Sequence, residues 1–106
     1  MEERETELIR EAVWGIEKVL DEYQNYIENP EAIRKIKSHV IDIRKSTLNS
    51  YILERVGSVE LNSNILFSAK RHLKYPDSRE LIIKSCKSII NHLSWQKREE
   101  HKETDV

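Results

Sequence analysis

The apolar residues in the first quarter of the chain recur at alternating steps of four and three residues. They are Ile9, Val13, Ile16, Leu20, Tyr23 and Ile27. Because an α-helix has about 3.6 residues per turn, this spacing places these side chains in one stripe along a helix. The pattern predicts a helix over residues 3–28 whose stripe faces the core of a bundle. A coiled-coil seam between two chains uses the same heptad spacing and is the alternative interpretation.

The segment Asn29-Pro30-Glu31 is typical of a helix start. An asparagine side chain accepts a hydrogen bond from a backbone N–H of the first turn, proline suits the first helical position, and glutamate complements the positive end of the helix. A connection this short predicts that the second helix runs back along the first. Its apolar stripe contains Ile33, Ile36, Val40, Ile43 and Thr47.

The second helix is expected to end near Val56, because Gly57 readily adopts the left-handed conformation that follows many helices. Small polar residues at 46–50 offer the backbone competing hydrogen bonds, so a break in that segment is the alternative. A third helix is then expected from Ser58 to about Tyr75. Its predicted stripe contains Leu61, Ile65, Leu66, Ala69 and Leu73.

The residues from Asp77 to Glu80 have the pattern of a capping box and predict a fourth helix from about Ser78 to Arg98. Its stripe contains Ile82, Cys86, Ile89 and Leu93. Amphipathic helices joined by short connections predict an all-α fold, an antiparallel up-down four-helix bundle. We expect one domain over residues 1–98 and a mobile C-terminal tail over residues 99–106, which lack apolar periodicity.

Charge is distributed unevenly along the chain, although the net charge of the 106 residues is only −1. Residues 1–31 contain ten acidic and three basic side chains, whereas residues 32–94 contain twelve basic and five acidic ones. One interpretation is intramolecular, with the acidic first helix packed against basic neighbours. The other is a basic surface that binds an acidic protein or a nucleic acid.

The sequence favours a cytoplasmic location. The first seven residues are mostly charged and do not resemble a secretory signal. The chain contains no apolar run of the roughly 20 residues that cross a bilayer, so no membrane association is expected. The single cysteine, Cys86, has no partner for an internal disulfide, which suits a reducing compartment.

No pattern in the chain predicts catalysis, a metal site or a cofactor. The histidines at 39, 72, 92 and 101 lack the spacing of metal-binding motifs, and Cys86 falls on an apolar stripe where thiols are usually inert. Two isolated glycines cannot form a phosphate-binding loop. Gly15, inside the first predicted helix, is expected to permit close approach of a neighbouring helix. No small-molecule site is evident.

Two short segments resemble known motifs. Arg34 and His39 fit the R-x4-H pattern of HEPN-type helical ribonucleases, a resemblance that spans six residues and implies that Arg34 steadies a phosphate while His39 transfers a proton. Residues five apart on a helix are separated by about 140°, so this pair converges only if two domains meet or the helix breaks. The last four residues resemble a class I PDZ ligand, with Thr104 and Val106 in the recognised positions.

Aromatic residues off the predicted core stripes mark a candidate partner-binding surface. Trp14 falls opposite the stripe of the first helix, among charged residues, and Trp95 lies off the stripe of the fourth. Phe67 falls on the far side of the third helix from its stripe. The basic residues that share this face with Phe67 are Lys70, Arg71 and Lys74. Exposed aromatic and basic side chains together are typical of interfaces, although packing of Phe67 on the second helix or the tail is the alternative.

Three functions follow from these patterns as hypotheses. The first is a non-enzymatic protein–protein interaction module, an adaptor or regulator that also self-associates, with Trp14 buried in a homodimer. The second is a weak nucleic-acid-binding bundle that uses basic residues such as Arg34, Lys37, Arg44 and Lys45. The third and least favoured is a HEPN-like ribonuclease.

Overall fold

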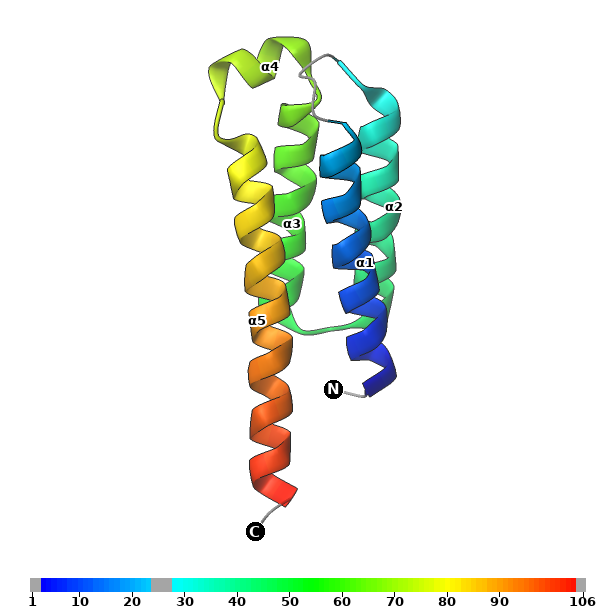
Figure 1. The fold of residues 1–106 in the computed structure, drawn as a ribbon, viewed down its shortest axis with the longest axis vertical. Coiled ribbons are helices and arrows are strands. Elements are labelled where there is room, and N and C mark those ends of the chain that lie inside the picture. Colours follow the sequence, from blue (N-terminus) through cyan, green and yellow to red (C-terminus); the bar gives the residue numbers. More distant parts are fainter. Residues whose placement is uncertain (1–2, 24–27, 105–106) are drawn as a thin grey trace.

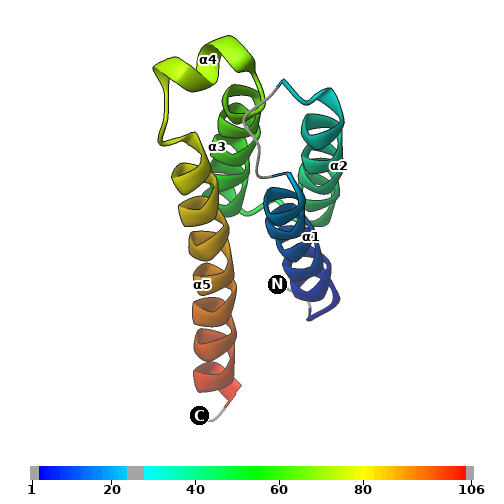
Figure 2. The same ribbon diagram turned by 45° about the horizontal axis from the view of Figure 1, so that its top comes forward.

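The computed structural model describes residues 3–23 and 28–104, with side chains described except at 69, 72 and 96–104. Over this part of the chain it contains four long helices and one short one. They are α1 (Glu3–Glu22), α2 (Pro30–Ser46), α3 (Ser50–Leu66), α4 (Ala69–Lys74) and α5 (Ser78–Thr104). The long helices run antiparallel in chain order, and α5 closes the bundle against α1 and α3 (Figures 1 and 2). The predicted all-α antiparallel four-helix bundle is confirmed.

The core stripes predicted for the first, second and fourth helices are confirmed. The buried apolar side chains on α1, α2 and α5 are Ile9, Ala12, Val13, Ile16, Val19, Leu20, Ala32, Ile36, Val40, Ile43, Ile82, Cys86, Ile89 and Leu93. Burying each large side chain contributes about 1.5–3 kcal/mol relative to exposure, so these stripes account for much of the drive to fold. Ile27, which was predicted on the same stripe as Ile9, lies outside the described residues.

The connection between α2 and α3 differs from the main prediction. The chain leaves the helix at Thr47, whose extended backbone lets its Oγ1 accept a hydrogen bond from Asn49 N–H at 3.0 Å. Asn49 Oδ1 then caps α3 by accepting from Ile52 N–H at 3.1 Å. The prediction that Gly57 ends the second helix is therefore wrong, and the alternative break at 46–50 is correct. Gly57 lies inside α3 without a positive φ.

This new start changes which face of α3 is buried. The buried residues of α3 are Ile52, Val56, Val59, Asn62, Ser63, Ile65 and Leu66, so polar residues occupy part of its core face. Asn62 Nδ2 donates to the Ser58 carbonyl oxygen at 2.8 Å, and Ser85 Oγ of α5 donates to Ser58 Oγ at 3.2 Å. These bonds satisfy polar atoms at the junction of α3 and α5. Leu61, which was predicted in the core, is exposed.

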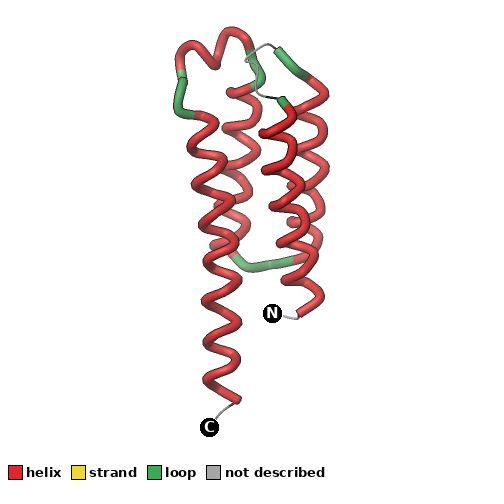
Figure 3. Tube along the Cα trace, viewed as in Figure 1, coloured by secondary structure: helices red, strands yellow, loops and turns green. Residues whose placement is uncertain are grey.

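The predicted third helix also ends earlier than expected. It stops at Leu66, and the chain turns through Phe67 and Ser68 into α4, a separate short helix across one end of the bundle (Figure 3). The fourth long helix, α5, begins at Ser78 as predicted but continues to Thr104 rather than ending near Arg98. Its last turns extend beyond the ends of the other helices (Figure 1). Mobility of the 99–106 segment stays a prediction.

Contacts between chain segments fix how the helices meet. Arg79 of α5 donates through Nη1 to the Leu20 carbonyl at 2.8 Å and through Nη2 to the Tyr23 carbonyl at 2.9 Å. These bonds satisfy carbonyl groups at the end of α1 that have no partner within the helix. Asn29 N–H donates to the Phe67 carbonyl at 3.0 Å and joins the α1–α2 connection to the end of α3. Within the described ranges, no helix combines the length and apolar character needed to cross a membrane.

Candidate interaction surfaces

The short helix α4 and the residue that follows it present apolar and basic side chains together. We call Lys70, Arg71, Leu73, Lys74 and Tyr75 the α4 surface. Leu73 is 83% exposed and Tyr75 is 49% exposed, while the three basic residues are all exposed. Lys74 Nζ lies 5.7 Å from the centre of the Tyr75 ring, a cation–π distance. Sequence reasoning found the basic residues but missed Leu73, which it placed in the core, and Tyr75.

Phe67 does not belong to this surface, so its prediction as an exposed aromatic is wrong. It is 1% exposed and packs edge-on against Tyr23, with 6.5 Å between the ring centres. The prediction assumed a continuous helix, in which Phe67 falls opposite the apolar stripe. Because α3 ends at Leu66, the chain turns and places the Phe67 ring in the core.

A small network next to Phe67 joins the top of α1 to α2. Lys35 Nζ donates to Tyr23 Oη at 3.0 Å and lies 4.0 Å from Glu22 Oε2. The hydrogen bond to Tyr23 is the main cause of a raised Lys35 pKa, and the charges of Glu22 and Glu31 add to it. This is one place where the acidic first segment meets a basic neighbour, as the intramolecular interpretation of the charge asymmetry expects.

Trp14 lies on the outer face of α1 and is 55% exposed. Its neighbours at helical spacing on that face include Glu7, Glu11 and Lys18, all exposed. The exposure predicted from the helical wheel is confirmed, but no contact in the structure shows what covers this side chain. A role for Trp14 in binding stays a prediction.

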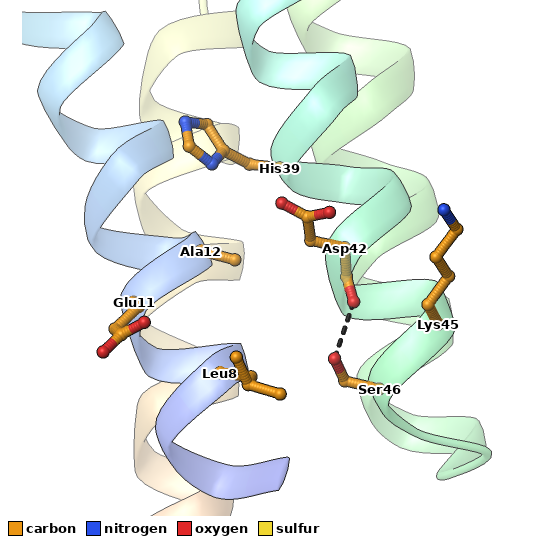
Figure 4. A pocket seen from close by; sticks show the side chains of 7 residues that line it. All are labelled: Leu8, Glu11, Ala12, His39, Asp42, Lys45 and Ser46. Carbon is orange, nitrogen blue, oxygen red and sulfur yellow. Dashed lines mark hydrogen bonds between the residues drawn. The ribbon is translucent and has the colours of Figure 1, made fainter. Parts of the chain in front are cut away.

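A groove of about 410 Å³ runs between α1 and α2 (Figure 4). Leu8, Glu11 and Ala12 of α1 line one side, and His39, Asp42, Lys45 and Ser46 of α2 line the other. In Figure 4 the Asp42 carboxylate lies between the two helices, whereas Lys45 extends away from α1. We call this feature the α1–α2 groove. Its lining includes two apolar side chains, two carboxylates and one lysine. In Figure 4 the Glu11 carboxylate lies on the side of α1 away from α2, at the rim of the groove.

His39 closes one end of the α1–α2 groove because α1 has no side chain at Gly15. A Cβ atom at Gly15 would overlap the His39 ring, so only glycine leaves room for the ring in this position. Gly15 was expected to permit close approach of a neighbouring helix, and the structure places the His39 side chain of α2 against it. Arg34 takes another direction on α2 and pairs with Glu31 at 3.0 Å. One chain therefore does not bring Arg34 and His39 together as a ribonuclease pair.

A second aromatic cluster lies at the end of the bundle away from α4. The His92 ring stacks on Tyr51, with 4.5 Å between centres, and on Trp95, with 6.0 Å between centres. Asn49 Nδ2 lies 3.3 Å from His92 Nε2. Since Asn49 Oδ1 already accepts from Ile52 N–H, the amide nitrogen faces His92, and Nε2 acts as the acceptor. Sequence reasoning singled out Trp95 but missed the stack, because it joins residues far apart in sequence.

Among the side chains that the structure describes, the thiol of Cys86 lies in the core. Cys86 is buried, and burial, followed by the charge of Glu17, raises its pKa from 9.0 to about 12. Its thiol is therefore protonated at neutral pH and a poor nucleophile. Among the residues that the structure describes, no group of histidine, cysteine and carboxylate side chains is placed to hold a metal ion.

Comparisons with protein families, with curated proteins and with solved structures find no match to this chain. The class of protein that the fold defines is a small antiparallel helical bundle. Its function therefore has to be inferred from the chemistry of its own surfaces. A fold of this kind hosts many unrelated functions, so the surfaces carry the inference rather than the topology.

Proposed function

We propose that this protein is a non-enzymatic interaction module, an adaptor or regulator that binds an acidic protein surface through the α4 surface. The observation that carries the proposal is the exposure of Leu73. This apolar side chain is 83% exposed and lies among basic residues on a helix. Single exposed leucines are common, but a leucine and a tyrosine surrounded by three cations resemble an apolar contact with a polar rim.

The two kinds of side chain contribute in different ways. Transferring Leu73 from water into a partner pocket contributes about 1.5–3 kcal/mol, and the aromatic ring of Tyr75 adds contact area at a low entropy cost. The charges of Lys70, Arg71 and Lys74 chiefly increase the association rate and select an acidic partner. Trp14 supplies a second contact, either for the same partner or for self-association.

A nucleic acid is the second candidate, favoured by the exposed Tyr75 ring beside three cations, because bases stack on aromatic rings while cations neutralise phosphates. Two other observations weigh against it. Arg34 is paired with Glu31 and Arg44 with Glu60, so two of the basic residues expected to contact phosphates are already in ion pairs. A HEPN-like ribonuclease is less favoured still, since Arg34 and His39 diverge within a chain.

We infer a cytoplasmic setting and no catalytic activity as parts of the same proposal. The single protonated thiol of Cys86 supports both, because it suits a reducing compartment and is a poor nucleophile.

A pull-down from nuclease-treated native lysate tests the proposal. Wild-type protein is compared with a Lys70→Glu/Arg71→Glu/Lys74→Glu variant and with a Lys84→Glu/Lys87→Glu variant, which reverses exposed charges on α5. We expect a protein that wild type and the α5 variant retain and the α4 variant loses. Equal retention by all three would contradict the proposal. A partner lost on nuclease treatment, with a gel shift that weakens steeply as salt rises, would favour the nucleic-acid alternative.

A further inference from the structure

The α4 surface and the α1–α2 groove have complementary chemistry. The α4 surface projects an exposed leucine flanked by Lys70 and Lys74. The groove has an apolar floor of Leu8 and Ala12, and its carboxylates are those of Glu11 and Asp42. The exposed leucine matches the apolar lining of the groove, and its basic neighbours match the carboxylates, which outnumber the one lysine in the lining.

The two features cannot meet within one molecule. Helix α4 lies across the end of the bundle where α1 finishes and α2 begins (Figure 1). The groove is lined by residues 8–12 near the start of α1 and by residues 39–46 near the end of α2, which places it toward the opposite end. Any contact between them therefore joins two molecules.

We propose that the acidic partner of the α4 surface is the α1–α2 groove of a second copy of this chain. Leu73 enters the groove over Leu8 and Ala12, and Lys70 and Lys74 approach Glu11 and Asp42. Lys45 also lines the groove and partly offsets its carboxylates, although in Figure 4 its side chain extends away from α1. The His39 ring, held against Gly15, forms the end wall of the site.

This contact is heterologous, because it uses a different patch on each copy. It is also small, so we expect weak association that grows with protein concentration. Ion pairs at its rim are screened by salt, so association weakens as ionic strength rises. The inference rests on the proposed function, because it names the partner of the same α4 surface.

Charge reversal on each side, followed by mixing, tests the contact. In the α4 double variant, Lys70→Glu/Lys74→Glu, both patches are acidic. In the groove variant, Glu11→Lys/Asp42→Lys, both patches are basic. We expect sedimentation velocity to show that each variant alone associates roughly tenfold or more weakly than wild type. An equimolar mixture should recover association, because each contact between the two variants pairs opposite charges.

Lys84→Glu/Lys87→Glu is the matched control for the α4 double variant, since it makes the same change in net charge at exposed α5 positions and should associate like wild type. Circular dichroism verifies that each variant remains folded. A wild type that stays monomeric at high concentration and low salt would overturn the second-copy proposal, and so would a mixture that fails to recover association. Neither result changes the outcome of the pull-down, because the pull-down tests binding of the α4 surface to other proteins. The two proposals can therefore fail separately.

Discussion

Gly15 shows how one residue makes room for a side chain of a neighbouring helix. The His39 ring of α2 occupies the space where any other residue of α1 would place its Cβ atom. Glycine costs a helix about 1 kcal/mol relative to alanine, so the close contact must offset this cost. The two effects can be separated, because the steric effect requires His39 and the helix propensity does not.

We expect Gly15→Ala to stabilise the protein by about 1 kcal/mol when His39 is also replaced by alanine. With His39 present, the new Cβ forces the ring out of its place, so the gain shrinks or reverses. Urea unfolding of the four members of this double-mutant cycle measures the difference.

Gly57→Ala is the matched control for this cycle. A Cβ at Gly57 meets nothing within 4 Å, and the residue lies inside α3 without a positive φ. It should stabilise by about 1 kcal/mol whether or not His39 is present. If Gly15→Ala had the same effect in both backgrounds, the ring would not occupy the position described.

At the scale of the elements, the α2–α3 connection depends on the side chain of Asn49. Its Oδ1 caps α3, and its Nδ2 bonds to His92 of α5. Asn49→Ala should lower the free energy of unfolding by about 1–2 kcal/mol, since it removes a helix cap and a hydrogen bond between elements. Urea unfolding measures the loss, and Asn91→Ala, an exposed position on α5, should change stability little. Equal effects of the two substitutions would show that Asn49 does not cap α3.

The elements also show how far the sequence determines the fold. The stripes of α1, α2 and α5 could be predicted because each keeps apolar residues at regular helical spacing. The buried face of α3 could not, since Asn62 and Ser63 lie on it while Leu61 points outward. Their polar atoms are satisfied by tertiary contacts, such as that between Ser58 and Ser85, which a single helical pattern does not reveal. The start of α3 was predicted only as the alternative break at 46–50.

The candidate site could likewise be predicted only in part. The basic residues of the α4 surface were found from charge and spacing alone. The sequence did not predict that Phe67 is buried or that Leu73 and Tyr75 are exposed. Both follow from the chain turn after Leu66. The groove was missed as well, since it joins residues from two helices that only the packed bundle brings together.

At the scale of the whole molecule, Cys86 reports on the integrity of the core. Its pKa is about 12 in the folded protein, against 9.0 for an unperturbed thiol, because burial disfavours the thiolate. Between these values the unfolded chain has released the proton and the folded chain still holds it. This thiol therefore makes stability fall as pH rises above about 9, by up to about 1.4 kcal/mol per pH unit.

Unfolding of wild type and Cys86→Ala across alkaline pH checks this prediction. Other groups titrate in the same range, but they are shared by both proteins, so the difference between the two isolates the thiol. The wild type should lose stability faster than the variant above pH 9. Parallel curves would mean that the thiol is not buried in the folded state.

The claim that the α4 surface is the binding site can be tested most directly by site-specific photocrosslinking. A photoreactive amino acid replaces Leu73, and in a control protein it replaces Leu61, which is exposed on α3 outside this surface. In native lysate, or with a second copy of the chain, position 73 should give a discrete adduct and position 61 should not. Adducts of equal yield at both positions, or at position 61 alone, would contradict the account.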